Sequence, residues 1–375
     1  MRLTAKGMGL SALGAGSLAL LGTWGVSAFA QNQSKPAPEA PKTAAQQFKN
    51  IQVLKDIPAE QLIPTMQFIA ASLGVECEFC HVEHEMQKDD KKPKQIARKM
   101  IEMELAINKG HFKNEIEVTC FTCHRGSERP VGTPILSAEA MKASAPEKEE
   151  GQGTQAKLPS ADQILDKYLA AVGGPTALMK VKTRVQKGTL QAGGMPYPIE
   201  VYSEAPDKRI SISHPQGGSS VTAFNGEVGW LSIRNGVHRM TELEREAARI
   251  DAELYFPAKV RELYKEFQAK PGEPIDGHAT YLVTAEAANL PLLQLYFDQS
   301  SGLLLRLMRF AQTPLGKNPT QIDYADYRVS DDVKIPYQWT LTRPNGSFTI
   351  KVDQVETNVA IDPKLFVPPS EGPGQ

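Results

Sequence analysis

The sequence predicts a multi-domain chain, in which a small all-α segment precedes an antiparallel β-rich domain of α+β type. Three observations support this prediction. A helical apolar pattern followed by a short cysteine motif occurs twice within residues 48–126. Beyond residue 182, short runs of strand-forming residues between turn residues dominate. A proline-rich and charged stretch at residues 127–158 separates the two parts and has the composition of a disordered linker.

The composition of the chain excludes few functions, but it narrows the class of protein to which the chain can belong. The chain has 375 residues, which suggests two domains. The formal net charge is −1 and 23% of residues are charged. Nothing in this balance indicates a nucleic-acid partner, and none is expected. The 27 prolines and 29 glycines favour linkers and turns over a continuous helical bundle.

The first 47 residues read as a targeting segment and a tether. Arg2 and Lys6 precede an apolar run, and Ala28-Phe29-Ala30 offers a small-x-small cleavage site. Residues 1–30 are therefore predicted to be a secretory signal peptide, with an uncleaved membrane anchor as the alternative. Residues 31–47 are rich in Pro, Ala, Lys and Gln and are predicted to be a flexible tether.

The all-α segment contains two copies of one unit, a helix followed by a turn and a cysteine motif. The first helix is expected to start at Asp56 and Pro58 and to stop at Gly74. Its apolar stripe consists of Leu62, Met66, Ile69 and Leu73. The second helix opens at Pro93 and ends near Asn108 and Gly110. Its stripe, which we expect to face inward, consists of Ile96, Met100, Met103 and Ile107.

Each unit ends in Cys-x-x-Cys-His, and the two motifs use all four cysteines of the chain. They are Cys77-Glu-Phe-Cys80-His81 and Cys120-Phe-Thr-Cys123-His124. Two thiols at this spacing reach the two vinyl groups of one porphyrin, and the adjacent histidine then ligates the iron. We therefore predict two covalently bound haem c groups, with thioethers from the four cysteines and His81 and His124 as proximal iron ligands. The alternatives are zinc, for which the gap between motifs is long, and disulfides, which leave both histidines without a role.

The sixth iron ligand decides the chemistry of each haem, because methionine closes the site whereas an open position permits catalysis. On the residues alone, Met66 is the candidate for the first haem. Met100 and Met103 are both candidates for the second. Loop residues His84, Met86 and His111 are further candidates. The alternative for each methionine is an ordinary core residue. The segment has fewer than 80 residues and a thin core, so we expect it not to fold without haem.

Residues 159–370 are predicted to form the β-rich domain, followed by a tail at 371–375. A capped helix is expected over 160–172, and helical or irregular structure over 240–264. A hairpin is expected across Asn225-Gly226 within 224–230. Other expected strands span 182–191, 197–204, 209–214, 279–285, 292–297, 302–311, 318–328, 337–342 and 347–355. Leu293, Leu295 and Phe297 are expected to point inward. His214, His238 and His278 are too scattered to suggest a metal site.

The cysteine units resemble the haem segments of the photosynthetic reaction-centre cytochrome c subunit family. The resemblance rests on Leu62 to His81, with Met66 inside, and on Ala97-Arg-Lys-Met100-Ile-Glu-Met103 continuing to Cys120-Phe-Thr-Cys-His-Arg-Gly126. It implies that Met66 ligates the first haem iron and Met100 the second, while Met103 packs. The family protein carries four haems, and this chain has two motifs.

The β-rich part is weakly similar to the half-barrel of outer-membrane lipoprotein-sorting proteins. The similarity rests on the pattern at 295–298, 302–303, 323–324, 326–327 and 335–336 and on the ending at 358–368. It implies a curved sheet that covers an apolar ligand.

Together these features predict a periplasmic dihaem c-type cytochrome that transfers single electrons and is not an enzyme, so no catalytic residue is assigned. Its expected partners are redox proteins, including a membrane photosynthetic or respiratory complex. The charged residues between Glu83 and Lys99 are the candidate docking surface, with a solvated loop and helix face as the alternative. The first alternative is a haem enzyme of the dihaem-peroxidase type. The second is a protein that binds a lipid or hydrophobic ligand and carries a redox haem module.

Overall fold

The computed structural model describes residues 42–130, 158–233, 236–288, 290–344 and 346–369, which lie within one compact unit. The predicted signal peptide, and most of the predicted tether and linker, lie outside these residues. We call residues 42–130 the helical module and residues 158–369 the sheet module. Within the described residues, no helix combines the length and apolarity needed to cross a membrane.

The helical module contains both predicted helices and a short helix at each cysteine motif. Its helices are α1 (Ala44–Gln47), α2 (Ala59–Leu73), α3 (Cys77–Cys80), α4 (Lys92–His111) and α5 (Cys120–His124). Helix α2 ends at Gly74, as predicted. This residue has φ +67°, a left-handed conformation that glycine adopts without steric cost.

The predicted inward stripe of α4 is wrong, because the helix is rotated about its axis relative to that prediction. Ile96, Met100 and Met103 are 47%, 39% and 47% exposed. The buried face consists of Lys94, Ile101, Glu104 and Asn108. These polar side chains have specific partners. Asn108, for example, donates to the Val118 carbonyl (2.6 Å) and accepts from the Val118 amide (3.0 Å). Such partners offset the cost of burial.

The two units of the helical module interlock instead of standing apart. Helix α2 of the first unit contacts α5 of the second, and α3 of the first contacts α4 of the second. The Gly126 amide, just after the second motif, donates to the Ser72 carbonyl on α2 (2.9 Å). The buried apolar cluster at this module is small and consists of Leu54, Phe68, Ile69, Ile101 and Leu315. The last of these comes from the turn between two strands of the sheet module.

The sheet module has helices α7 (Ala161–Ala171), α8 (Gly174–Lys180), α9 (Glu242–Ala252) and α10 (Phe256–Leu263), and a 3-10 turn η1 (Pro363–Phe366). Helix α7 confirms the predicted capped helix. The Ser160 hydroxyl accepts from the Gln163 amide (3.2 Å), and the Gln163 side chain accepts from the Ser160 amide (2.8 Å). This reciprocal pair satisfies two backbone donors at the helix start.

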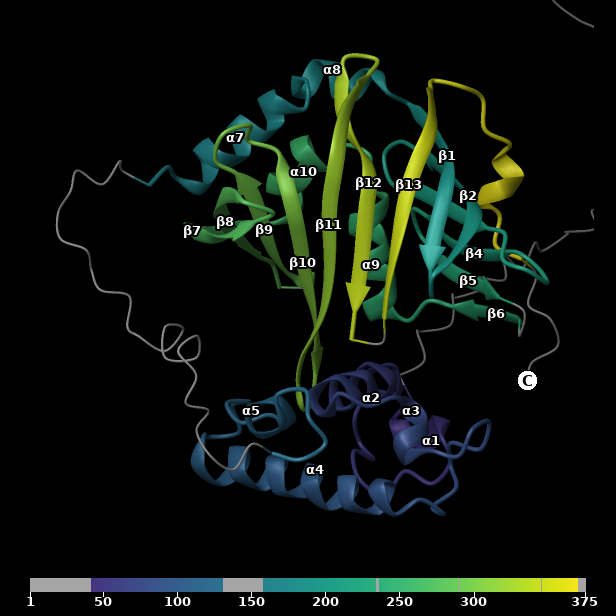
Figure 1. Cartoon of the computed structure of the whole chain (residues 1–375), viewed down its shortest axis with the longest axis vertical. Helices are drawn as coiled ribbons and strands as arrows, with labels where there is room; N and C mark the ends of the chain where they lie inside the picture. Colours follow the sequence, from purple (N-terminus) through teal and green to yellow (C-terminus); the bar gives the residue numbers. More distant parts are fainter. Residues whose placement is uncertain (1–41, 131–157, 234–235, 289, 345, 370–375) are drawn as a thin grey trace, which may run out of the picture. The chain divides into compact units, whose positions relative to one another are not determined.

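The described strands form one antiparallel sheet, as predicted (Figure 1). They are β1 (Thr183–Ala192), β2 (Met195–Glu204), β3 (Lys208–Ser213), β4 (Ser220–Asn225), β5 (Gly229–Ile233), β6 (Gly236–Arg239), β7 (Glu266–Ile275), β8 (His278–Glu286), β9 (Leu292–Asp298), β10 (Leu304–Thr313), β11 (Gly316–Ser330), β12 (Val333–Arg343) and β13 (Gly346–Thr357). Their order is β6-β5-β4-β3-β2-β1-β13-β12-β11-β10-β9-β8-β7. The first and last strands of the chain therefore pair in the middle of the sheet.

The sequence did not predict the two edge strands, β6 and β7. Strand β7 contains Pro271 and Pro274, which normally argue against a strand. Because β7 lies at the edge of the sheet, it pairs only with β8. Proline is tolerated there because the missing N–H is not needed for a second ladder.

The core of the sheet module lies between the sheet and its helices. Leu293, Leu295 and Phe297 are completely buried, as predicted. The ring of Tyr168 on α7 packs against Phe297 with a centroid distance of 5.1 Å. Helices α9 and α10 lie behind the central strands in the view of Figure 1. This arrangement leaves a cavity of about 800 Å³ on the helix-covered side of the sheet.

Candidate functional site

The first cysteine motif forms a single helical turn. Cys77 and Cys80 begin and end α3, and His81 follows with an extended backbone (φ −112°, ψ 150°). Residues three apart in a helix lie on one side of it, so the two thiols face the same way. Both are free thiols, Cys77 exposed and Cys80 half-buried. Burial raises the pKa of the Cys80 thiol above its usual value.

The second motif also forms a short helix, α5, which includes the motif histidine His124, whereas His81 lies just beyond α3. The Thr119 hydroxyl caps the helix by accepting from the Thr122 amide. Arg125 ends the helix in a left-handed conformation (φ 51°). Cys120 is half-buried and Cys123 is exposed, and both are free thiols. The two motifs thus present the same pair of thiols on the same kind of turn.

The two motif histidines are each oriented by the same kind of hydrogen bond, between ring Nδ1 and a backbone carbonyl oxygen. Nδ1 of His81 lies 2.8 Å from the Met86 carbonyl oxygen, and Nδ1 of His124 lies 3.0 Å from the Ser127 carbonyl oxygen. A carbonyl only accepts, so Nδ1 carries the proton and the lone pair is on Nε2. This arrangement is typical of histidines that ligate a metal through Nε2. The residues present therefore fit a haem iron at both positions.

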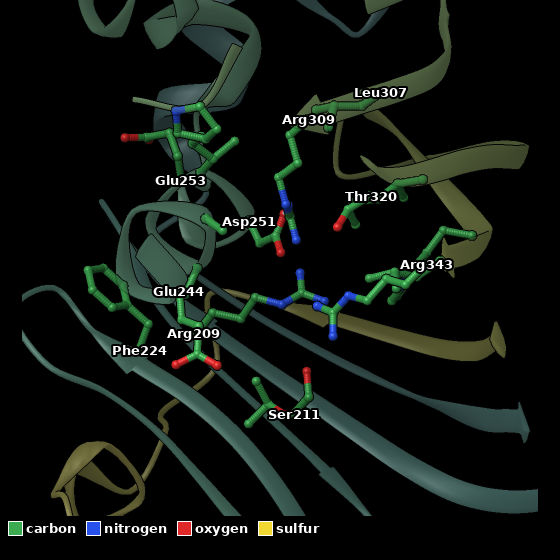
Figure 2. Close-up of a pocket in the computed structure, with 18 of the residues that line it drawn as sticks. Arg209, Ser211, Phe224, Glu244, Asp251, Glu253, Leu307, Arg309, Thr320 and Arg343 are labelled. Atoms are coloured by element: carbon green, nitrogen blue, oxygen red, sulfur yellow. The ribbon is translucent and has the colours of Figure 1, made fainter. Parts of the chain in front are cut away.

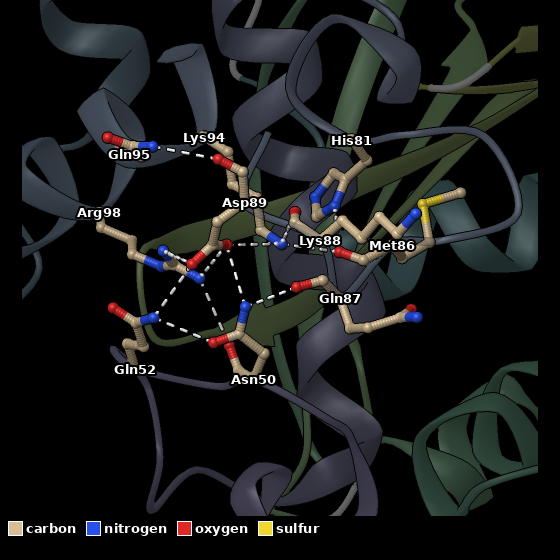
Figure 3. Close-up of polar contacts among 10 residues, drawn as sticks. All are labelled: Asn50, Gln52, His81, Met86, Gln87, Lys88, Asp89, Lys94, Gln95 and Arg98. Carbon is tan, nitrogen blue, oxygen red and sulfur yellow. Dashed lines mark hydrogen bonds and ion pairs between the residues drawn. The ribbon is translucent and has the colours of Figure 1, made fainter. Parts of the chain in front are cut away.

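A polar network fixes the loop that carries the Met86 carbonyl (Figure 3). Lys94 Nζ donates to the carbonyls of Met86 (2.8 Å) and Lys88 (2.7 Å). Asp89 receives both guanidinium nitrogens of Arg98 (2.9 and 2.8 Å) and the Asn50 amide (3.0 Å). The Arg98 guanidinium, the Asn50 amide and Lys94 hold the pKa of Asp89 well below its usual range. These residues hold the loop against α4.

This positioning role was not evident in the sequence, where the charges between Glu83 and Lys99 suggest one docking surface. Lys94 is only 9% exposed and Arg98 is half-buried, so part of this set is engaged inside the module. Other members, such as His84 and Lys92, are exposed. The sequence separation of Asp89 and Arg98 was a signal that the two residues could form an ion pair. It does not show which loop that ion pair holds in place.

Beside the second motif, Glu104 on α4 contacts Cys120. Its Oε2 accepts from the Cys120 thiol at 2.9 Å. Its Oε1 is buried and has no partner within the described part of the chain. Burial raises the pKa of the Glu104 carboxyl, and burial together with Glu104 raises the pKa of the Cys120 thiol. The sequence did not indicate this contact between Glu104 and the second motif.

The predicted methionine ligands occupy different environments. Met66 on α2 is half-buried and packs against the same apolar cluster as Cys120. Met100 on α4 is 39% exposed. The contacts of α2 with α5 and of α4 with α3 place the helix of each unit beside the motif of the other unit. The structure leaves the assignment of Met66 to the first iron and Met100 to the second as a prediction.

Exposed apolar side chains accumulate on the helical module. They include Ile96, Met100, Met103, Phe112 and Phe121, each between 39% and 53% exposed. A porphyrin ring would cover such a surface, and large exposed apolar side chains commonly mark a binding surface. This distribution is a second observation that fits a large apolar group beside the motifs.

The structure also bears on the alternatives for the motifs. None of the four cysteines forms a disulfide. Within the described ranges, no three His, Cys, Asp or Glu side chains gather as a metal-holding group. The histidines of the sheet module lie apart, and each has its own neighbour. His214 pairs with Ser219 (3.1 Å), His238 with Glu244 (2.9 Å), and His278 with Asp298 (3.3 Å).

Comparison with known proteins agrees with the motif geometry. Residues 5–184 match the family model of the photosynthetic reaction centre cytochrome C subunit. The predicted resemblance is thus confirmed over that part of the chain. The subunit from Thermochromatium tepidum is 36% identical over 105 residues, which cover 26% of each protein. The subunit from Roseobacter denitrificans is 33% identical over 139 residues, covering 32% of this chain and 36% of that protein. The chain therefore spans well under half of the length of these relatives.

Solved structures similar to the chain match it over about half its length. A DUF1329 family protein from Desulfovibrio piger covers 55% of this chain and 96% of its own, with a TM-score of 0.39 and 12% identity. A LolA superfamily protein from Nitrosomonas europaea covers 56% and 98%, with a TM-score of 0.39 and 14% identity. A putative outer membrane lipoprotein-sorting protein domain from Vibrio parahaemolyticus gives a TM-score of 0.38.

Proposed function

We propose that the chain is a periplasmic dihaem c-type cytochrome that transfers single electrons. The observation that carries the proposal is the shared geometry of the two motifs. In each, two thiols lie on one helical turn, and the next histidine has Nδ1 bound to a carbonyl, which leaves the lone pair on Nε2. When bound, the two haem irons supply the redox chemistry by cycling between the ferrous and ferric states.

The chain's own residues bind and orient the two haems. Cys77 and Cys80 hold the first haem through thioethers, and Cys120 and Cys123 hold the second. His81 and His124 ligate the irons, with Met66 and Met100 as the sixth ligands. The Met86 and Ser127 carbonyls fix the two imidazole rings, so the backbone contributes to the ligand geometry at each iron.

The partner that we propose is another redox protein, either a membrane photosynthetic complex or a respiratory one. The relatives are named as reaction-centre subunits, which supports the photosynthetic choice. No acid or base is needed for single-electron transfer, and the protein is proposed to be a carrier and not an enzyme.

The test is a quantitative haem analysis and redox titration of the purified, exported chain. We expect two covalently bound haems per chain and reversible one-electron reduction at each iron. High-spin ferric haem together with turnover of hydrogen peroxide would instead establish the dihaem-peroxidase alternative.

A second function is proposed for the sheet module, namely binding of a hydrophobic ligand. The observation that favours it is the cavity of about 800 Å³, which falls within the size range of small-molecule sites. Delipidated protein is expected to take up an apolar probe. Failure to take up any such probe would contradict this function and leave the cytochrome proposal intact.

A further inference from the structure

Four arginine side chains line the cavity of the sheet module. They come from four strands: Arg184 from β1, Arg209 from β3, Arg309 from β10 and Arg343 from β12. Figure 2 shows the side chains of Arg209, Arg309 and Arg343 extending toward one another near Asp251. Several like charges in one partly apolar cavity are costly unless anions balance them.

One of the four arginines has its counter-charge within the protein. Arg309 is 4% exposed and forms an ion pair with Asp251 of α9. Burial alone would lower the pKa of Arg309, but Asp251 outweighs burial and raises it. This pair is therefore close to neutral.

The other three arginines are not balanced in this way. Among the residues that the structure describes, the guanidiniums of Arg184, Arg209 and Arg343 form no ion pair, and Nε of Arg184 is buried without a hydrogen-bond partner. Burial, and then the neighbouring Arg209, lowers the pKa of Arg184 to about 10. Burial also lowers the pKa values of Arg209 and Arg343. Arg209 lies over the Trp339 ring, with 5.8 Å from guanidinium carbon to ring centroid.

Three further carboxylates line the cavity, but each already has a donor. Glu244 accepts from the Thr241 amide (2.9 Å) and from His238 (2.9 Å), and its side chain is 46% exposed. Glu253 accepts from the Tyr255 amide (3.0 Å), and Glu60 accepts from the Glu242 amide (3.1 Å). These carboxylates stay charged, and Asp251 and Glu244 attract Arg343 from a distance. Within the described part of the chain, however, none of them forms an ion pair with Arg184, Arg209 or Arg343.

The rest of the lining combines hydroxyl donors with apolar walls. The hydroxyl residues Ser211, Ser213, Thr222 and Thr320 lie among the lining residues. The apolar walls include Leu190, Ile199, Phe224, Leu307, Ile322 and Ile350. The cavity thus offers charged groups, hydroxyl groups and apolar contacts to a ligand.

We propose that this cavity binds an amphipathic anion, a molecule with an alkyl or acyl chain and one carboxylate or phosphate headgroup. Arg209 and Arg343 hold the headgroup with support from Arg184, and the chain lies against the apolar walls. The inference rests on the proposed hydrophobic-ligand function and adds the headgroup charge to it. A bound anion supplies the direct ion-pair partner that the three arginines lack among the described residues.

The experiment uses the full haem-loaded chain, delipidated, in equilibrium dialysis with radiolabelled dodecanoate. Competitors of equal chain length are unlabelled dodecanoate, dodecyl phosphate and the neutral dodecanol. We expect dodecanol to compete at least about ten-fold more weakly than either anion, because it lacks a charge-assisted hydrogen bond. Tighter competition by dodecanoate identifies a carboxylate headgroup, and tighter competition by dodecyl phosphate a phosphate.

Arginine variants test the headgroup residues. Arg209→Gln and Arg343→Gln are each expected to weaken dodecanoate binding about ten-fold and to leave dodecanol binding unchanged. They should not lower the melting temperature of the delipidated protein, since each removes an unbalanced charge. Arg328→Gln is the matched control, because Arg328 is exposed and pairs with Asp326.

Two results would overturn the inference in distinguishable ways. Equal binding of dodecanol and dodecanoate removes the anion requirement and leaves the hydrophobic-ligand function standing. Absence of binding by every probe contradicts both. If one glutamine variant fails to fold, Arg343→Lys and Arg209→Lys, which keep the charge, must still bind the anion in preference to dodecanol.

Discussion

The Met86 carbonyl oxygen connects the orientation of His81 with the polar network of Lys94 and Asp89. It accepts from His81 Nδ1 and from Lys94 Nζ, both at 2.8 Å. Lys94 is in turn 3.2 Å from Asp89, which also binds Arg98 and Asn50. The orientation of the proposed first iron ligand therefore depends on a carboxylate outside the cysteine motif.

Protonation of Asp89 should loosen this loop. The pKa of Asp89 is lowered in the folded protein, so the carboxylate stabilises the fold above its unfolded pKa of about 4. That stabilisation is lost as the pH falls below about 4 toward the folded pKa. Acid titration followed by the haem absorption band should show a smaller loss between pH 5 and 2 for Asp89→Asn, which starts less stable at pH 7. Identical acid curves for the variant and the native protein would refute this role.

The methionine ligands can be tested one at a time. A weak far-red absorption band of ferric haem reports the iron–methionine bond. Met66→Ala and Met100→Ala should each remove part of this band, and the double variant should remove all of it. Met103→Ala serves as the control, since Met103 is on the same helix and is 47% exposed. An undiminished band in the double variant would exclude both assigned residues, and a partly diminished one would exclude one of them.

At the scale of elements, the close approach of α2 to the second motif depends on Gly74. A β-carbon placed on Gly74 would lie 2.2 Å from the Gly126 carbonyl oxygen, and Gly74 has φ +67°. The steric clash and the left-handed backbone conformation both exclude a side chain at position 74. The two glycines thus join the end of one unit to the end of the other.

Gly74→Ala should therefore destabilise the helical module by more than about 1 kcal/mol, the ordinary cost of a left-handed residue. Gly110→Ala is the control, because Gly110 lies in α4 and a β-carbon added there would meet nothing within 4 Å beyond its own helix backbone. It should stabilise the helix by about 0.5–1 kcal/mol. Thermal unfolding followed by circular dichroism measures both. Equal effects of the two substitutions would contradict the close approach.

Elements with a strong local signal were predictable from the sequence. The Ser160 cap, the Gly74 stop and the alternation at Leu293, Leu295 and Phe297 all reflect short-range patterns. Strand β7 was missed because its prolines are acceptable only at a sheet edge, and edge position is a tertiary property.

The buried face of α4 was also beyond sequence reasoning. Its polar residues turn inward because the segments that flank the helix fold back and supply their partners, such as Val118 for Asn108 and Met86 for Lys94. The arginines of the cavity were missed because their contacts are truly long-range. Arg209 and Arg343 are 134 positions apart in the chain, and only the sheet topology brings their strands to one cavity. The cysteine motifs, in contrast, carry their chemistry in five consecutive residues.

At the scale of the whole molecule, the two modules differ in how they are stabilised. The sheet module has an extensive buried core, whereas the apolar cluster of the helical module has four buried residues of its own, joined by Leu315 of the sheet module. A core this small does not compensate for the conformational entropy of ordering such a segment. The helical module is therefore expected to need its haems.

Replacing all four cysteines by alanine tests this dependence. The variant should keep the β-sheet signal in circular dichroism, while the helical module becomes susceptible to limited proteolysis. The native, haem-loaded chain treated in parallel is the control. Proteolysis that leaves residues 42–130 intact in the variant would show that the polypeptide core suffices.

The pairing of β1 with β13 also determines the order in which the sheet can be completed. Each half of the sheet is a run of neighbouring strands that forms from local contacts, but the joint between the halves links residues such as Arg184 and Thr357. Closing so long a loop is slow, and until it closes both halves expose a central strand edge. Nascent chains that stop before β13 would therefore hold two open edges, and each is a template for pairing with another chain. The exposure ends when the 12 residues of β13 pair with β1 on one side and β12 on the other.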